Sequence, residues 1–485
     1  MDIIEQLNRV WHILAAAFTL FISIVASGHA ILFKRDSRST TLWVSLIWLF
    51  PIGGAILYLT FGINRIRRRA RQLRAHLTRF QAIPSAPPCS PESVPHHLAN
   101  AGAHLATLAS LIDRVTVRPL LPGNSVEPLI NGDEAYPAML EAIRGAKNSI
   151  GFATYIFDRG IAGDQFAKAL ADAVQRGVEV RVLIDDTGSR YSWPSIVKDL
   201  RRLGVTVALF NRAFMSFRVM SINLRNHRKL LVIDGETGFT GGINIRDGHQ
   251  LHLQPRRPVQ DLHFRVKGPV VAHLKEAFAD DWLFTTREAL RGGKWFPSLS
   301  CEGAAIARGI VDGPDEDYDK LRQSIMGALS CARSSVQIVT PYFLPDAALL
   351  AAINVAALRG VHVNILLPQE NNLPFVQWAM QATLWQVLER GCHVWMTPPP
   401  FDHSKLMIVD GHWSLIGSAN WDARSLRLNF EFNVECYDGA LAQRLSEIVM
   451  EKRCGARELT LQDIDRRSLP VRLRDGIARL AIPFL

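Results

Sequence analysis

The sequence predicts an α/β protein built from two halves that a pseudo-twofold axis relates, preceded by a two-helix transmembrane hairpin. Three observations support this fold class. A short polar pattern occurs twice with identical internal gaps, about 176 residues apart. A strand–helix–strand order comes before each copy, as in a βαβ unit. Two apolar runs near the N-terminus are each long enough to cross the hydrocarbon core of a membrane.

The apolar runs are residues 11–33 and residues 41–63, and the second run contains Pro51. A cleaved signal peptide would have a shorter apolar core behind a basic start. Here Asp2 and Glu5 precede the first run, and a second run follows it. We therefore expect both runs to remain as membrane spans, joined by a short basic loop.

A block of arginines without any acidic residue follows the second run. Its members are Arg65, Arg67, Arg68, Arg69, Arg71 and Arg74. Because cytoplasmic loops carry an excess of Lys and Arg, the block predicts that the main domain is cytoplasmic. The net charge of +10 fits an anionic partner. A basic run can bind nucleic acid, but directly after a span it is more typical of contact with anionic phospholipids, so we expect no nucleic-acid partner.

Composition divides the chain into four segments. Residues 1–80 contain the hairpin and the basic block, and residues 81–115 contain a proline-rich linker. Residues 116–300 form the first α/β half, and residues 301–485 form the second. The six cysteines are scattered without metal-ligand spacing, which indicates neither a zinc site nor a disulfide framework.

Both halves show a strand, then an amphipathic helix, then a β-branched strand. In the first half these are residues 149–158, 165–175 and 178–184, and in the second half they are residues 335–346, 347–358 and 361–367. Two such units related by a pseudo-twofold axis would bring the two copies of the polar pattern together at their seam.

The repeated pattern is a histidine, a lysine and an aspartate, followed by a glycine and an asparagine. The first copy is His227, Lys229, Asp234, Gly241, Gly242 and Asn244, and the second is His403, Lys405, Asp410, Gly417, Ser418 and Asn420. One five-letter match of this kind has odds on the order of 10⁻⁷ per start position. A lone His-x-Lys indicates a solvated surface, whereas the duplication indicates shared chemistry.

Displacement at a phosphodiester needs a nucleophile, an acid for the leaving alkoxide, and cations around the phosphoryl oxygens. Residues two apart on a strand leave the same face, so each His-x-Lys would present both side chains together. The apolar residues 230–233 and 406–409 would anchor the pairs as buried strands. Two ammonium groups supply the positive charge, so the pattern predicts no metal and no other cofactor.

The other members of the pattern have expected places too. Asn244 and Asn420 would bind the phosphate beside the lysines, and Ser418 would add a hydroxyl in the second half only, because Gly242 takes its place in the first. Asp234 and Asp410 belong to the candidate catalytic set by position, although we expect both to close strand ends by bonding backbone amides.

The doubled HKD pattern resembles that of the phospholipase D superfamily. With the two spans before it, nearly the whole chain resembles bacterial cardiolipin synthases of the phospholipase D type. The resemblance implies a bacterial inner (cell) membrane protein that transfers a phosphatidyl group between two phosphatidylglycerol molecules and releases glycerol. It implies a phosphatidyl-histidine intermediate, with His227 as the nucleophile and His403 as acid and then base.

Members of the superfamily place an acid downstream of each HKD to orient its histidine. The match in the first half is Asp261. In the second half, Glu431 is the match once Val434 is aligned with Val266. This alignment puts the two acids at slightly different places in their halves.

Three other functions were weighed against the synthase. A membrane-tethered phospholipase D-type hydrolase would carry the same residues. A nuclease of the superfamily usually lacks the hairpin, and a scaffold without activity would have lost a histidine or a lysine. The sequence leaves the second alcohol, the ratio of transfer to hydrolysis and the oligomeric state open.

The C-terminal tail has an amphipathic pattern. Leu473, Ile477, Leu480 and Ala481 recur at helical spacing, and the positions between them include Arg472, Arg474, Asp475 and Arg479. Two interpretations stay open: the apolar stripe packs on the second half, or the helix lies at a membrane interface with its arginines on anionic lipid.

Overall fold

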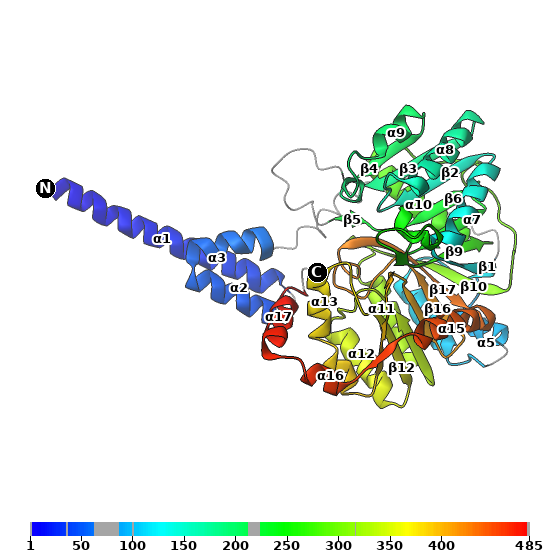
Figure 1. Ribbon diagram of the computed structural model, residues 1–485. Coiled ribbons are helices and arrows are strands. Elements are labelled where there is room, and N and C mark those ends of the chain that lie inside the picture. The colour runs from blue at the N-terminus through cyan, green and yellow to red at the C-terminus, as the bar shows by residue number, and fades with distance from the viewer. Residues whose placement is uncertain are drawn as a thin grey trace. The chain divides into compact units, whose positions relative to one another are not determined.

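The computed structural model describes residues 2–34, 37–62, 87–98, 101–211, 224–315 and 317–482. The chain divides into two compact units, Met1–Ala70 and Arg71–Leu485, which are described separately (Figure 1). The arginine block at 65–74, on which the predicted orientation depends, lies outside the described residues.

The N-terminal unit contains the helices α1 (Asp2–Phe33), α2 (Ser37–Leu49) and α3 (Pro51–Leu57), then a π-helical turn over Tyr58–Gly62. Within the described residues, one helical stretch is long and apolar enough to span a membrane, Val10–Phe33. The second apolar run does not form a single helix, because Pro51 lacks the N–H that would continue the hydrogen bonding of α2. The expected hairpin is therefore found only in part.

The three helices of this unit pack through small residues. Ala26 and Ala30 of α1 share a buried cluster with Ile47 of α2, and the His29 ring bonds the Tyr58 hydroxyl at 2.9 Å. A Cβ on Gly54 would lie 2.4 Å from the Leu46 carbonyl oxygen. Glycine at position 54 therefore lets α3 approach α2 closely.

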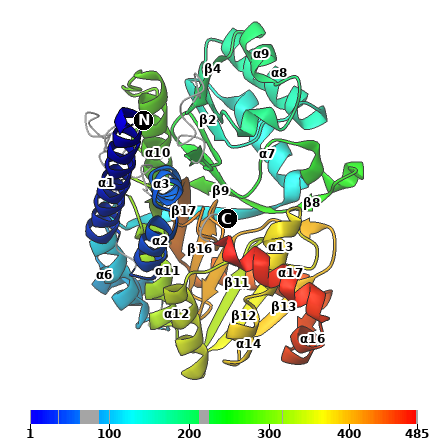
Figure 2. The same ribbon diagram turned by 90° about the vertical axis from the view of Figure 1, so that its left-hand side faces the viewer.

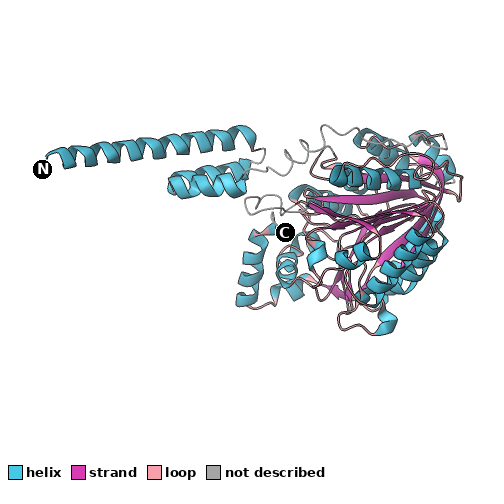
Figure 3. Cartoon of the chain, turned by 90° about the horizontal axis from the view of Figure 1, so that it is seen from above, coloured by secondary structure: helices cyan, strands magenta, loops and turns pink. Residues whose placement is uncertain are grey.

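The second unit is built on one long mixed sheet. Among the described residues, sixteen strands join it, and fifteen of them follow the order β18-β13-β12-β11-β15-β16-β17-β10-β1-β9-β7-β6-β2-β3-β4. Helices cover both faces of this sheet (Figure 3). A separate two-stranded ribbon pairs β14 with β8.

The first half contains β1 (Leu121–Ile130), α7 (Asn131–Gly145), β2 (Ser149–Thr154), α8 (Ile161–Gln175), β3 (Glu179–Asp185), α9 (Val197–Arg202), β4 (Thr206–Phe210), β5 (Arg225–Asn226), β6 (Leu230–Ile233), β7 (Thr237–Gly241), β8 (Val259–Gln260), β9 (Leu262–Lys267) and α10 (Val271–Thr286). The predicted βαβ unit is confirmed as β2-α8-β3, with β2 parallel to β3 and antiparallel to β6.

The second half contains β10 (Ala305–Asp312), α11 (Lys320–Cys331), β11 (Ser335–Val339), α12 (Ala347–Leu358), β12 (His362–Pro368), α13 (Pro374–Gln381), α14 (Trp385–Leu388), β13 (His393–Thr397), β14 (Phe401–Asp402), β15 (Leu406–Val409), β16 (Trp413–Gly417), β17 (Asn429–Tyr437), α15 (Gly439–Cys454), β18 (Arg457–Leu459), α16 (Leu461–Asp465) and α17 (Leu469–Leu480). Its β11-α12-β12 unit repeats the pairing of the first half, with β15 antiparallel to β11.

The two halves have separate apolar cores and a continuous sheet between them, which crosses from one half to the other where β1 pairs with β10. The region predicted as a linker also contains structure: α5 (Val94–His97) and α6 (Leu105–Val115). The buried face of α6, with Leu105, Leu108 and Ile112, joins the core of the second half. An apolar residue at every third or fourth position explains why this stretch folds as a helix.

The C-terminal tail forms the expected helix, α17, and packs beside α13 (Figure 2). Asp475 and Ala478 are the buried residues of α17, whereas Leu473, Ile477 and Leu480 are exposed. The interpretation that the apolar stripe packs on the second half is therefore wrong.

Candidate active site

The histidine and the asparagine of both copies of the HKD pattern line one cleft of about 930 Å³ in the second unit, whereas the two lysines are buried and do not line it. His227 and Asn244 reach it from the first half, and His403 and Asn420 reach it from the second. The His-x-Lys residues lie just before their strands rather than on them, since β6 begins at Leu230 and β15 at Leu406. The buried strands still anchor the two histidines on opposite sides of the cleft.

Each histidine is attached to the backbone of the opposite half. The His227 N–H donates to the Phe430 carbonyl oxygen at 2.9 Å, where β5 pairs with β17. The His403 N–H donates to the Gln260 carbonyl oxygen at 2.8 Å, where β14 pairs with β8. The two crossings are equivalent, so they hold the histidines in a pseudo-twofold arrangement.

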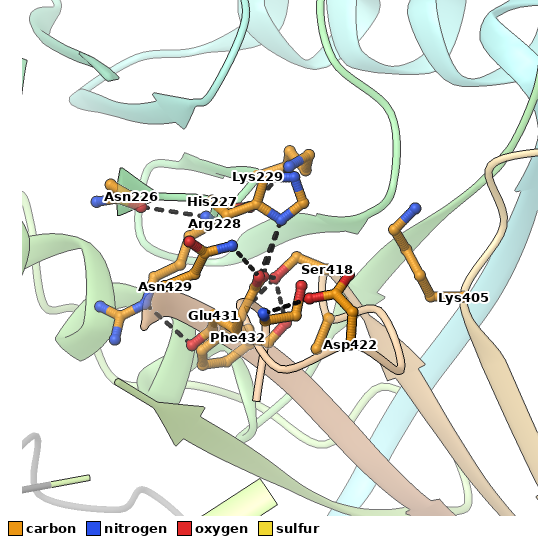
Figure 4. A network of polar contacts seen from close by, with 12 residues as sticks. Asn226, His227, Arg228, Lys229, Lys405, Ser418, Asp422, Asn429, Glu431 and Phe432 are labelled. Atoms are coloured by element: carbon orange, nitrogen blue, oxygen red, sulfur yellow. Dashed lines mark hydrogen bonds and ion pairs between the residues drawn. The ribbon is translucent and has the colours of Figure 1, made fainter. Parts of the chain in front are cut away.

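The orienting acids cross over in the same way. His227 Nδ1 lies 3.0 and 3.1 Å from the two carboxylate oxygens of Glu431, and His403 Nδ1 lies 2.7 Å from Asp261 Oδ2. Figure 4 shows Glu431 beneath His227. The expectation that each acid orients the histidine of its own half is wrong. Asp261 directly follows β8, which pairs with β14 just before His403. Glu431 directly follows the residues of β17 that pair with β5, just before His227.

The two acids also occupy equivalent positions. Gly241 pairs with His263, and Gly417 pairs with Asn433, so Asp261 and Glu431 each lie two residues before the partner of the repeat's glycine. The valine alignment was shifted by two residues. The sequence alone does not reveal this equivalence, because Asp261 follows Gly241 by 20 residues and Glu431 follows Gly417 by 14.

The carboxylates determine which nitrogen of each imidazole carries the proton. An ionised carboxylate can only accept, so Nδ1–H donates to it and Nε2 keeps its lone pair. Burial opposes ionisation of Glu431, but His227, Lys229 and Ser418 outweigh it and hold the pKa of this carboxyl below its ordinary value. Burial raises the pKa of Asp261, although Lys405 opposes the shift.

Burial favours the neutral form of both imidazoles. Burial lowers the pKa of His227, with Lys229 adding to the shift and Glu431 opposing it. Burial, then the two lysines, lowers the pKa of His403 well below its ordinary value. A neutral imidazole with a free Nε2 lone pair is the form that can attack phosphorus.

The two lysines lie beside the histidines. Lys229 Nζ donates to the His227 carbonyl oxygen at 2.7 Å, and Lys405 Nζ donates to the His403 carbonyl oxygen. Burial lowers the pKa of Lys229 to about 7 and that of Lys405 to about 8. An anion in the cleft would favour the charged form of both ammonium groups.

The asparagines line the cleft, and the serine supports an acid. Asn244 Oδ1 accepts from the Ile156 N–H at 3.1 Å, whereas Asn420 Oδ1 is buried without a partner among the described residues. The Ser418 hydroxyl donates to Glu431 at 2.5 Å instead of facing the cleft. At Gly242 a Cβ would come within 2.2 Å of the Asp261 carboxylate, which explains the absence of a serine there.

The aspartates of the pattern lie away from the cleft. Asp234 accepts three backbone N–H bonds at residues 147–149, and Asp410 accepts three at residues 333–335. Asp410 also contacts His104 at 2.7 Å. Both aspartates close strand ends, as the sequence predicts, and neither lines the cleft.

Several residues of the cleft were missed from the sequence. They are Tyr155, Tyr342, Arg225, Arg246, His249, Asp422 and Arg424. The ring centroids of Tyr155 and His227 lie 5.2 Å apart, and those of Tyr342 and His403 lie 6.3 Å apart. These residues lie outside the five-letter pattern. The two tyrosines are also offset by one residue when the two strand segments are aligned, because Tyr155 directly follows Thr154 whereas Tyr342 is two residues after Thr340. The repeat therefore does not reveal them.

The residue next to each histidine in the chain belongs to a charged pair. This residue is a cation, Arg228, in the first half and an anion, Asp402, in the second. In the first half, Arg228 binds Asp281 of α10 at 2.8 Å, and both side chains are fully buried. In the second half, Asp402 binds Lys452 of α15 at 2.8 Å. Among the described residues, no group of three or more His, Cys, Asp or Glu side chains could hold a metal ion.

Comparisons with known proteins agree with the doubled site. Residues 139–282 and 325–452 match the family model described as "Cardiolipin synthase, PLD-like domain", and residues 21–62 match "Phospholipase D-nuclease N-terminal". The phosphatidylserine synthase of Haemophilus influenzae has a similar fold, with a TM-score of 0.60 at 17% identity over 78% of this chain and all of that one.

Curated relatives cover nearly the full length. A cardiolipin synthase of Geobacillus kaustophilus is 31% identical over 99% of this chain and 95% of its own. Cardiolipin synthase A of Pseudomonas fluorescens is 33% identical over 96% of both chains. The relatives and the apolar helix of the N-terminal unit together indicate association with a membrane. The chain belongs to the cardiolipin synthase family of phospholipase D-like proteins.

Proposed function

We propose that this chain is a cardiolipin synthase, which transfers a phosphatidyl group from one phosphatidylglycerol to another and releases glycerol. The observation that carries the proposal is the pair of imidazoles in one cleft, each held at Nδ1 by a buried carboxylate of the opposite half. The full-length relatives named as cardiolipin synthases support the same activity.

In the first step, Nε2 of His227 attacks the phosphorus of the first lipid. The bond between phosphorus and the glycerol oxygen breaks, and the leaving alkoxide takes the proton from Nε2 of His403, whose protonated form the bound phosphodiester anion favours. The products of this step are glycerol and a phosphatidyl group bound to His227. In the second step, His403 removes the proton from a hydroxyl of the second phosphatidylglycerol, whose oxygen attacks phosphorus and displaces His227.

We assign the nucleophile to His227 because of its acid. Glu431 keeps a pKa below its ordinary value and stays ionised, whereas burial raises that of Asp261. A phosphorylated imidazole that keeps its Nδ1 proton is cationic, and the carboxyl with the lowered pKa, Glu431, more strongly favours the ionised form that stabilises this cation. Glu431 and Asp261 are positioning residues in this scheme.

Four side chains bind the phosphoryl oxygens in the proposal. Lys229 and Lys405 supply positive charge, and Asn244 donates from Nδ2, since its Oδ1 is held by a backbone N–H. Asn420 completes the set from the other half. Ser418 acts through Glu431, to which its hydroxyl donates. Asp234 and Asp410 bind backbone N–H groups. In this proposal, none of the three contacts the reacting atoms.

The proposed substrates are phosphatidylglycerol and other anionic phospholipids, and Arg225, Arg246 and Arg424 give the cleft positive charge to meet their headgroups. We place the protein in the bacterial inner membrane by two passes of its N-terminal unit, with residues 116–300 and 301–485 as the catalytic halves on the cytoplasmic side. The reaction needs no metal, because the lysines neutralise the phosphate.

The test uses the full chain reconstituted in vesicles that contain labelled phosphatidylglycerol. We expect cardiolipin and free glycerol in equal amounts, with little phosphatidic acid. Phosphatidic acid as the main product, at all lipid densities, would instead identify a membrane-tethered phospholipase D-type hydrolase.

A further inference from the structure

The helix α17 presents its apolar face to solvent. Leu469, Leu473, Ile477 and Leu480 are 68%, 58%, 65% and 74% exposed. Their spacing of four, four and three residues places them on one side of the helix. Four large apolar side chains in one exposed row exceed the scattered apolar residues that an ordinary surface carries.

Charged residues fix the orientation of this helix. Asp475 is fully buried on the opposite side, where Arg467 and Arg474 bind its carboxylate at 2.8 and 2.7 Å. The Arg474 guanidinium also lies over the Trp378 ring of α13, 4.5 Å from its centroid. A rotation that buried the apolar row would expose this ion-pair network, so the row is held outward.

Arginines border the apolar row on both edges. At 100° per residue, Arg472 and Arg479 lie along one edge and Arg474 lies along the other. All three are exposed. An apolar face between cationic edges is the pattern of a helix that lies in the interface of an anionic bilayer.

The helix α17 packs on an element that lines the cleft. The helix packs on α13, and the two run side by side in Figures 1 and 2. Leu373, just before α13, and Val376 within it line the cleft. Leu373 and Phe375 are 47% and 42% exposed, so the segment on which α17 packs also carries exposed apolar side chains.

We propose that the outer face of α17, together with Leu373 and Phe375, is a lipid-contact surface that holds the cleft against an anionic bilayer. The charge of its edges selects anionic lipid over a second protein chain as the occupant. The proposal rests on the proposed function only in that the substrate is a lipid of that bilayer.

The direct test is a fluorescent probe on α17 of the full chain in anionic vesicles. A bimane label at Ile477→Cys, with the exposed Cys301 and Cys454 changed to serine, reports contact with brominated lipid chains. We expect strong quenching at 477 and little quenching at a matched label, Val355→Cys, on the exposed side of α12. Equal quenching at the two positions would overturn the proposal, and the readout needs no enzymatic activity.

A kinetic test complements the probe. The double variant Leu473→Gln/Ile477→Gln should raise the apparent KM on anionic vesicles about tenfold and leave turnover in detergent micelles unchanged. The control Val355→Gln/Leu358→Gln changes two equally exposed apolar side chains of α12 and should alter neither.

Other occupants of the surface give different outcomes. Disulfide-linked dimers through Ile477→Cys at high dilution in vesicles would identify a second copy on this face and overturn the proposal. A cross-link from position 477 to the N-terminal unit would also overturn it. Loss of cardiolipin synthesis with quenching retained would contradict the proposed function alone.

Discussion

The charge of two buried lysines determines how the site responds to pH. Burial lowers the pKa of Lys229 to about 7 and that of Lys405 to about 8, so both are charged below these values and lose charge as the pH rises through them. Because kcat/KM reports groups of the free enzyme, it should fall above about pH 7–8.

The measurement is kcat/KM for phosphatidylglycerol between about pH 5.5 and 9.5, at constant ionic strength. The Lys229→Arg variant serves as the comparison, because arginine stays charged throughout and should move the alkaline limb from about pH 7 up to the pKa of Lys405, about 8. A wild-type profile that stays level to the alkaline end would show that the lysines keep ordinary pKa values.

The crossed acids give a second prediction at this scale. Glu431→Gln should slow the first step on the order of 10²–10⁴-fold, because its partner is the proposed nucleophile. Asp261→Asn should spare the first step when the leaving group needs no acid, and slow the second. Phosphatidyl-p-nitrophenol separates the steps, since a burst of nitrophenol reports the first one.

A normal burst in Glu431→Gln together with a slowed burst in Asp261→Asn would mean that His403 is the nucleophile. Bursts of equal size in both would mean that neither acid acts through a single histidine. Far-ultraviolet circular dichroism serves as the folding control, because both carboxylates are buried.

At the scale of elements, a charged pair within each half holds the segment that carries the histidine of that half. Arg228 and Asp281 are both fully buried, so removing one partner leaves an uncompensated charge. We expect Asp281→Ala to destabilise the second unit by about 3–5 kcal/mol. Thermal or urea unfolding in detergent measures the loss.

The control is Asp199→Ala, which removes a partly exposed partner of Arg159 and should cost at most about 1 kcal/mol. Equal losses in the two variants would mean that the buried pair adds no more than a surface pair. Each value refers to unfolding of the second unit monitored by the same signal.

The strand–helix–strand units could be predicted because their periodicity is local: Ser149–Thr154 and Ser335–Val339 are strands, and Ala347–Leu358 is a helix. The pairing of β5 with β17 could not be predicted, since it joins segments about 200 residues apart. Glu431 was therefore found as a candidate residue but assigned to the wrong histidine.

Two helices show the same limit. The apolar run at residues 41–63 continues through Pro51, so its hydropathy predicts one span, whereas the missing N–H of Pro51 ends α2 before it. The α17 helix was predicted from its spacing, but the outward direction of its apolar row depends on the Asp475 ion pairs with Arg467 and Arg474, which spacing does not reveal.

At the scale of the whole molecule, catalysis should not depend on a divalent ion. Lys229 and Lys405 supply the positive charge that a metal would otherwise bring to the phosphate. Cardiolipin formation by the full chain should survive exhaustive treatment with EDTA. Complete loss, restored by one divalent ion at micromolar concentration, would contradict this view of charge stabilisation.

The central claim is that the two halves contribute one histidine each, with His227 carrying the phosphatidyl group. Both His227→Ala and His403→Ala should fail to make cardiolipin, but only one should trap the intermediate. Mass spectrometry of peptides from His403→Ala after incubation with phosphatidyl-p-nitrophenol should find a phosphatidyl adduct on His227, and His227→Ala should give none. An adduct on His403 in the His227→Ala variant, or no adduct in either variant, would contradict the account.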